Sequence, residues 1–86
     1  MEFDAAKAAA NLSKHGVAFE EAASALLDPS ALVKEDTDAE AENRWILLGM
    51  SARARLLVVV YTLRGEDTVR IISARRATRA ESRNYA

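Results

Sequence analysis

The residues best suited to chemistry are arginines, and three of them lie close together near the end of the chain. The segment Thr68–Arg76 reads T-V-R-I-I-S-A-R-R and contains Arg70, Arg75 and Arg76. An arginine at the end of a strand can lie on the surface with its aliphatic stem against apolar neighbours, or it can bind an anion through its paired N–H donors. The segment therefore allows an anion-binding site but does not require one.

Three further residues could transfer protons. His15 could be a general base, although a lone histidine also suits the C-terminal end of a helix, where positive charge is favoured. Glu81 could be a base, but it can also complete a capping box with Thr78. Tyr85 follows Glu81 by four residues and shares its helical face, where it could serve chemistry or packing alone.

The composition describes one small globular domain that spans residues 1–86. Half of the residues are hydrophobic, which supports a packed core and argues against disorder. The chain has no cysteine and one histidine, so we expect no disulfide, no metal site and no cofactor. It lacks an apolar run of the roughly 18 residues that a membrane span needs, and its acidic N-terminus lacks a signal-peptide pattern. We expect a soluble, cytoplasmic protein.

The charges are divided unevenly along the chain. Residues 1–43 hold three basic and ten acidic residues, a net charge of −7, whereas residues 44–86 hold nine arginines and three acidic residues, a net charge of +6. The two halves could neutralise each other within the fold. Alternatively, the arginines form a basic face that meets phosphate groups or an acidic partner. The residues alone predict a small domain with a basic face that could bind nucleic acid.

The hydrophobic pattern predicts an α+β fold with helices on one face of a small antiparallel sheet of three or four strands. We expect helices from Asp4 to about His15 and from about Phe19 to Leu27, and a short C-terminal helix after Thr78. The expected strands are a short one at 31–33 and longer ones at Arg44–Met50, Leu56–Leu63 and Thr68–Arg76. Between the first two strands, Lys34–Asn43 is expected to be an acidic loop.

Two of the predicted strands have informative side-chain patterns. The run L-L-V-V-V-Y at 56–61 is almost continuously apolar, which predicts a central strand covered on both faces. In Thr68–Arg76, strict alternation predicts two sets of residues on opposite faces. The first set is Val69, Ile71, Ser73 and Arg75, and the second is Arg70, Ile72, Ala74 and Arg76.

Ordered blocks at both ends of the chain resemble the BrnT toxin family. The first block runs from Asp4 to Ala22 and includes K-H-G-V and F-E-E-A. A D-P pair follows at Asp28, and L-L-V-V-V-Y-T-L-R-G resembles the family's V-V-x-T-x-R-G strand. The last block, from Arg70 to Tyr85, matches the family's R-I-I-S-A-R-x-A-T-x-x-E-x-x-x-Y. The resemblance covers nearly the whole chain.

Three positions depart from the family pattern. Phe3 stands where the family often has tryptophan, and Ala18 replaces a common serine cap. The chain ends one residue after Tyr85, so we expect that tyrosine to lie on a frayed end. The first two departures are expected to affect stability only.

The resemblance implies a ribonuclease toxin of a bacterial type II toxin–antitoxin module, with a fold similar to the RelE and ParE toxins. Such a toxin cleaves RNA without a metal ion and inhibits translation. Its expected partner is a BrnA-like ribbon-helix-helix antitoxin, which neutralises it in a hetero-oligomer and is the only link to operator DNA. The alternative is a non-catalytic module of the same fold that acts through antitoxin binding and operon autoregulation. The near-neutral net charge of −1 favours this alternative, because RNA affinity rests on phosphate neutralisation.

A metal-free ribonuclease needs cations at the scissile phosphate and a group that moves the 2′-hydroxyl proton. For charge stabilisation, the resemblance and the residue types predict Arg64 and Arg75. For binding of the RNA backbone they predict Arg70, Arg76 and Arg79. The candidates for proton transfer are Lys14 with His15, or Glu81 with Tyr85.

Overall fold

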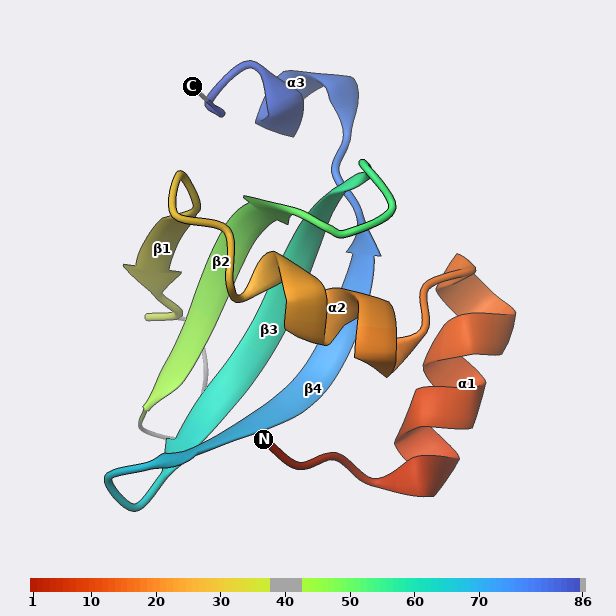
Figure 1. Ribbon diagram of the computed structural model, residues 1–86, viewed down its shortest axis with the longest axis vertical. Coiled ribbons are helices and arrows are strands. Elements are labelled where there is room, and N and C mark those ends of the chain that lie inside the picture. Colours follow the sequence, from red (N-terminus) through yellow and green to blue (C-terminus); the bar gives the residue numbers. More distant parts are fainter. Residues whose placement is uncertain (38–42, 86) are drawn as a thin grey trace.

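The computed structural model describes residues 1–37 and 43–85, which form a four-stranded antiparallel sheet with two helices on one side and a third helix at one end (Figure 1). The elements are α1 (Ala5–His15), α2 (Phe19–Ala25), β1 (Leu32–Glu35), β2 (Arg44–Met50), β3 (Leu56–Arg64), β4 (Thr68–Arg76) and α3 (Arg79–Ser82). The strands pair in chain order, so β1 and β4 are the edges of the sheet. This architecture confirms the predicted α+β fold, with four strands.

Two predicted boundaries are wrong by two residues. The helix α2 ends at Ala25 rather than Leu27, because the chain tightens there into bonds between each N–H and the carbonyl three residues earlier. The strand β1 continues through Lys34 and Glu35, which were expected in the acidic loop, because both residues pair with β2. Of that expected loop, residues 38–42 lie outside the described residues.

The ends of α1 are fixed by the residues that the sequence indicated. The Asp4 carboxylate accepts hydrogen bonds from the backbone N–H groups of Ala6 and Lys7, at 2.8 and 3.1 Å. Gly16 adopts a left-handed conformation with a φ of 69°, which a residue without a Cβ adopts without strain. These two caps end α1 where the chain must turn to begin α2.

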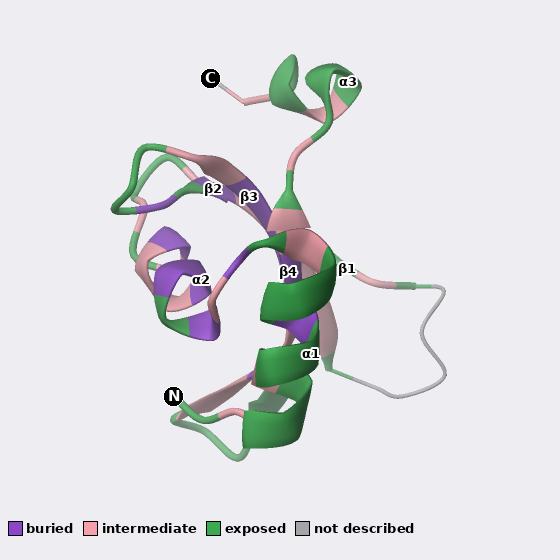
Figure 2. Ribbon diagram, turned by 90° about the vertical axis from the view of Figure 1, so that its right-hand side faces the viewer, coloured by how far each residue is buried: buried purple, intermediate pink, exposed green. Residues whose placement is uncertain are grey.

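The hydrophobic core lies between the sheet and the helices (Figure 2). Its members come from α2, from the turn before it, and from the helix-facing positions of β2, β3 and β4: Val17, Phe19, Ala22, Ala25, Leu47, Leu57, Val59, Ile71 and Ala74. The fully buried Phe19 meets Phe3 edge to face, with 5.4 Å between the ring centroids. Gly49 lets α2 approach β2, since a Cβ there would lie 2.8 Å from the Ala25 carbonyl oxygen. The core therefore requires glycine at this contact.

A β-bulge interrupts the pairing of β3 with β4. Val60 pairs with Ser73, but the next residue of β3, Tyr61, pairs with Ile71, so Ile72 is the extra residue. One extra residue reverses the faces of all side chains beyond it. The strict alternation predicted for β4 is therefore wrong: Ile71 and Ala74 both lie in the core, each 1% exposed.

The strand β3 is central, as predicted, but only one of its faces is covered by helices. The helix α2 packs on β2, β3 and β4, and α1 packs on β4, all on the same side (Figures 1 and 2). On the opposite side, which we call the open face, no helix of the described residues lies across the strands. Of the apolar residues of 56–61 on the open face, Val58 is 6% exposed and Val60 is partly exposed, although no described helix lies across them.

Candidate active site on the open face of the sheet

Three rows of side chains run across the strands in the central part of the open face. Residues directly opposite each other in antiparallel strands share a face, so the strand registers define each row. The first of these rows consists of Leu32, Leu48, Val58 and Arg75. The middle row consists of Lys34, Ile46, Val60 and Ser73. The last row includes Arg44, Thr62 and Arg70. The face therefore has an aliphatic centre with cations at its margins.

The first two rows line a groove with a volume of about 340 Å³. Its floor is aliphatic, and its polar margin is formed by Lys34 from β1, Ser73 and Arg75 from β4, and Glu81 and Asn84 from the C-terminal segment. The three longest side chains of this margin thus come from β1, β4 and α3. The groove combines a surface suited to apolar groups with donors suited to an anion.

Arg75 is held in the groove by a bidentate ion pair. Its Nη1 and Nη2 atoms donate to the two carboxylate oxygens of Glu81, at 2.7 and 2.8 Å, and Nη1 also donates to the carbonyl of Arg76 at 3.3 Å. A guanidinium has five N–H donors. The Nε donor and one Nη2 donor of Arg75 have no protein partner within residues 1–37 and 43–85. Arg75 is therefore fixed in direction but retains donors for a further anion.

The chain around Glu81 explains both its position and its charge. Glu81 forms the predicted capping box with Thr78, accepting from the Thr78 N–H at 2.8 Å while its own N–H donates to the Thr78 hydroxyl. The ion pair with Arg75, followed by this backbone hydrogen bond, lowers the pKa of Glu81 to about 2. So low a pKa makes the carboxylate a weak base. Its geometry instead suits the orientation of Arg75.

Tyr85 anchors the C-terminal segment to the connection between α2 and β1. Its hydroxyl donates to Oδ2 of Asp28, which also accepts from the Met50 N–H at 2.8 Å, and the Asp28 hydrogen bond raises the pKa of the Tyr85 phenol. Tyr85 is half-buried rather than extended into solvent. The segment after β4 is thus held at both ends, by Arg75 with Glu81 and by Asp28 with Tyr85, and Tyr85 does not line the groove.

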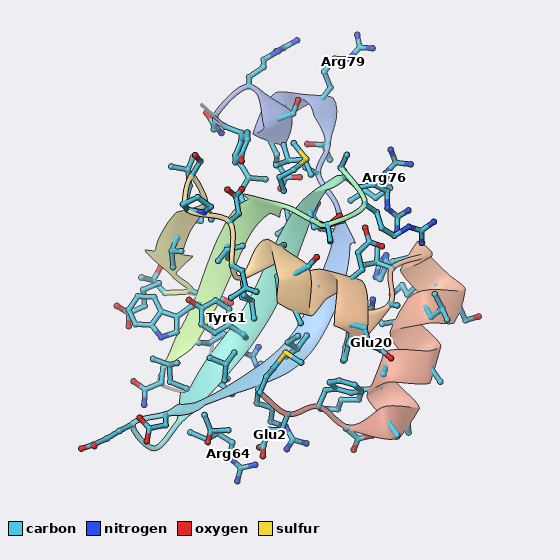
Figure 3. The ribbon with its side chains drawn as sticks, viewed as in Figure 1. Glu2, Glu20, Tyr61, Arg64, Arg76 and Arg79 are labelled. Atoms are coloured by element: carbon cyan, nitrogen blue, oxygen red, sulfur yellow. The ribbon has the colours of Figure 1, made fainter. Side chains whose placement is uncertain are left out.

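Arg64 lies beside Glu2 at the other end of the sheet (Figure 3), and Arg70 pairs with the same glutamate. Both donate to Oε1 of Glu2, at 3.3 and 3.2 Å. Arg64 pairs with Thr68 beside the β3–β4 turn, whereas Arg75 pairs with Val58 at the far end of β3. The fold therefore does not bring Arg64 and Arg75 together. By strand alternation Arg64 and Arg70 lie on the same face as Arg75, but Arg70 is about 13 Å away from it at roughly 3.3 Å per strand residue, and Arg64 is farther still.

Arg76 and Arg79 lie at the α3 end of the molecule (Figure 3), where β4 ends and α3 begins. Arg76 pairs with the buried Leu57, so it projects on the side that the helices cover. Arg79 begins α3 and is exposed. Neither residue lines the groove.

Lys14 and His15 lie in the last turn of α1, where the helix dipole favours positive charge. Because α1 packs on the covered side of the sheet, at the β4 edge, these residues are separated from the groove by the strand itself (Figure 1). Neither residue lines the groove. Of the predicted proton-transfer candidates, only Glu81 lies beside Arg75.

Three polar residues of the open face were missed by the sequence reasoning. The hydrophobic pattern predicts Lys34 in an acidic loop and Arg44 at the start of a strand, and no sequence pattern indicates Asn84. Pairing β1 with β2 in register would have placed Lys34 opposite Ile46, but the sequence of β1 is too short to predict that register.

A second ion pair of the same type holds the covered side together. Glu21 is buried, and its carboxylate accepts two hydrogen bonds from Arg55, one of them at 2.8 Å, and one from the Ser51 hydroxyl at 2.7 Å. Arg55 also donates to the carbonyl of Gly16 at 3.1 Å. The pair with Arg55 lowers the pKa of Glu21 to about 2. This network joins α2 to the β2–β3 loop and to the end of α1, and it does not open onto the groove.

Two further features of the described chain bear on function. No group of three or more histidine, aspartate or glutamate side chains within the described ranges is arranged to hold a metal ion. In the same part of the chain, every helix is too short or too polar to cross a membrane.

Two comparisons with known proteins gave matches, one to a protein family and one to a solved structure. The family model described as "Ribonuclease toxin, BrnT, of type II toxin-antitoxin system" matches residues 3–81. The 1.1 Å crystal structure of the Brucella abortus ribonuclease toxin BrnT is similar in fold, with a TM-score of 0.71 and 23% identity over 92% of this chain and 96% of that one. A search of curated proteins gave no significant match. Since the family model covers most of the chain, the protein belongs to the BrnT family of ribonuclease toxins of type II toxin–antitoxin systems.

Proposed function

We propose that this protein cleaves RNA at the open face of its sheet, without a metal ion, and inhibits translation by doing so. The observation that carries the proposal is the placement of Arg75. It is held by Glu81 at the margin of a groove, and two of its N–H donors remain available. Across the groove, Lys34 adds a cation without an ion-pair partner among the described residues.

The proposed reaction is attack of a ribose 2′-oxygen on the adjacent phosphorus. A bond forms between the 2′-oxygen and phosphorus, the bond from phosphorus to the 5′-oxygen breaks, and the products are a 2′,3′-cyclic phosphate and a 5′-hydroxyl. The 2′-hydroxyl loses its proton to a water molecule of the solvent, and the leaving 5′-oxygen takes a proton from solvent water. Arg75 stabilises the charge that develops on the phosphate oxygens, Glu81 orients it, and Arg70 binds the RNA backbone farther along the same face.

The experiment is RNA cleavage in EDTA by protein purified free of antitoxin. Arg75→Ala is expected to lower the cleavage rate by at least 100-fold, a loss of the size seen when one charge-stabilising donor is removed. Arg76→Ala is the matched control, because Arg76 is the next residue but projects on the covered side; its rate should stay within about threefold of wild type. Wild-type cleavage by the Arg75 variant, or no cleavage in EDTA by any form, would overturn the proposal.

The same face is proposed as the docking surface for the antitoxin, which the family membership implies as a partner. The proposed occupant is a segment of a BrnA-like ribbon-helix-helix protein that places aliphatic side chains on the groove floor and a carboxylate near Lys34. Leu32 is 43% exposed and Val33 49% exposed at the β1 edge, and an apolar surface left open is typical of a protein interface. In such a hetero-oligomer, RNA and antitoxin exclude each other, and operator DNA is contacted only through the antitoxin.

The docking proposal is tested by adding one charge to the groove margin. Leu32→Glu should weaken binding of the purified cognate antitoxin by at least tenfold, because a carboxylate cannot be buried there without a partner. The matched control is Leu27→Glu, since Leu27 is 83% exposed on the α2–β1 connection and does not line the groove. Equal effects of the two variants would contradict the proposed surface.

The alternative function is a non-catalytic binding module, and one observation favours it. The charge of Arg75 is neutralised by Glu81, which weakens the attraction between this site and a phosphate. Under this alternative, the protein free of antitoxin leaves RNA intact in EDTA but still binds the antitoxin, and Leu32→Glu still weakens that complex. The two experiments above therefore distinguish the two functions.

A further inference from the structure

The bulge in β4 decides which arginine enters the groove. If β4 alternated strictly from the buried Ile71, Ser73 and Arg75 would lie on the covered side and Arg76 on the open face. Because Ile72 is an extra residue in the pairing, Ser73 and Arg75 line the groove and Arg76 lies on the covered side instead. The site thus depends on the position of a single irregularity, and a shift of register would exchange the two arginines.

The outer edge of β4 is held on both sides of this bulge. Before it, the backbone of Glu2 forms two hydrogen bonds, with its N–H donating to the Val69 carbonyl at 2.8 Å and its carbonyl accepting from the Ile71 N–H at 3.1 Å. After the bulge, the side-chain amide of Asn11 forms hydrogen bonds to β4 of the kind that a backbone peptide group of a neighbouring strand would form. Its Nδ2 donates to the Ala74 carbonyl at 2.8 Å, and its Oδ1 accepts from the Ala74 N–H at 3.1 Å.

Asn11 is the only buried residue of α1. Its Nδ2 also donates to the Val17 carbonyl at 2.9 Å, in the turn between α1 and α2. All three hydrogen bonds are made inside the protein, so each would leave a buried backbone group without a partner if the side chain were removed. Asn11 thus ties the residue just before Arg75 to two other parts of the fold.

We propose that Asn11 is a positioning residue of the active site, which fixes the register of β4 after the bulge and thereby directs Arg75, rather than Arg76, into the groove. This inference rests on the proposed function of Arg75. It assigns no contact with RNA to Asn11, which acts on the reaction only through the backbone of Ala74.

The test is a double-mutant cycle of Asn11→Ala and Arg75→Ala, measured as RNA cleavage rates in EDTA. In the wild-type background, Asn11→Ala should lower the rate at least tenfold, whereas in the Arg75→Ala background it should change the rate less than twofold, because the group on which it acts is gone. Ser51→Ala is the control, since it removes a buried hydrogen bond of the Glu21 network that is not made to β4; its effect should be small and equal in both backgrounds. Independent, multiplying effects of Asn11 and Arg75 would overturn the inference.

A second readout does not depend on ribonuclease activity. The carboxyl of Glu81 has a pKa lowered to about 2 by Arg75, so NMR titration of Glu81 reports whether Arg75 is in place. In Asn11→Ala this pKa should rise toward 4.5, the ordinary value of the group, whereas in Ser51→Ala it should not. If Arg75→Ala cleaves RNA normally, the proposed function fails. The titration of Glu81 still tests whether Asn11 positions Arg75. An unchanged titration in Asn11→Ala would contradict that role.

Hydrogen exchange of the wild-type protein tests the role of Asn11 even if the Asn11 variants do not fold. In the wild-type protein, the Ala74 N–H lies on the outer edge of an edge strand and is bonded to the Asn11 side chain. Its hydrogen exchange should therefore be slow, comparable to that of the Ile71 N–H, which Glu2 protects. Rapid exchange at Ala74 would show that the side chain does not hold this part of β4.

Discussion

Two glutamate–arginine pairs in this protein have the same chemistry and different surroundings. Both are bidentate, and in both the arginine lowers the pKa of the glutamate to about 2. The side chains of Glu21 and Arg55 are 4% and 23% exposed, whereas those of Glu81 and Arg75 are 33% and 42% exposed. The comparison teaches that burial, rather than the ion pair itself, separates a structural contact from a candidate site.

The largest effect on stability is expected from breaking the buried pair. Glu21→Ala leaves Arg55 and the Ser51 hydroxyl without their acceptor, and removing one partner of a buried ion pair typically costs about 3–5 kcal/mol. Urea unfolding at pH 7 measures the change. Glu81→Ala should lower the free energy of unfolding far less, and a larger loss there than in Glu21→Ala would reverse the comparison.

A second prediction compares the two faces of β3. Val59 is fully buried on the covered side, whereas Val60 is partly exposed on the open face. Val59→Ala should cost on the order of 1–3 kcal/mol through lost burial and a cavity, and Val60→Ala should cost less than half as much. Thermal melts of the two variants decide the matter; equal losses would show that the open face is packed like the core.

The pH dependence of stability gives a third prediction. The pKa values of Glu21 and Glu81 are lower in the folded protein than their ordinary value of 4.5, so the folded state binds these protons less readily than the unfolded state. Their stabilisation is complete above about pH 4.5 and is lost as the pH falls toward 2. Unfolding of the wild type at pH 7 and pH 3 should show this loss. Glu21→Gln should remove more of it than Glu81→Gln, because solvent weakens the exposed pair.

The smallest effect is expected at the end of the chain. Tyr85→Phe removes the hydrogen bond to Asp28 but keeps the ring. The melting temperature should change little, whereas hydrogen exchange in α3 should quicken, because the segment is then held by the pair of Arg75 with Glu81 and by the hydrogen bond from the Ala77 N–H to the Leu56 carbonyl. Unaltered exchange in α3 would show that Tyr85 does not anchor it.

The sequence predicted the elements well, because the signals for them are local. Asp4 and Gly16 fix the ends of α1, and Thr78 with Glu81 forms the capping box of α3 as expected. The apolar run in β3 correctly indicated a central strand. An apolar residue, however, does not reveal whether it faces a helix of its own chain or an uncovered surface, so the open face could not be predicted.

The candidate site was predicted only in part, because it depends on contacts between distant parts of the chain. Arg75 and Glu81 lie six residues apart, and both were chosen as candidates from the sequence. The bulge at Ile72, however, is held by Glu2 and Asn11, which no local pattern in β4 indicates. For the same reason, the sequence could not show that Arg64 and Arg75 lie at opposite ends of β3.

The central claim is that the open face is the surface that binds both RNA and the antitoxin. It is tested most directly by methyl NMR of the protein with its cognate antitoxin. Successive valines of β3 report opposite faces: Val58 and Val60 lie on the open face, whereas Val59 lies in the core. The predicted result is intermolecular contacts from the methyl groups of Val58 and Val60, with none from Val59. Contacts confined to the methyl groups of α1 and α2, with Val58 and Val60 unchanged, would contradict the claim.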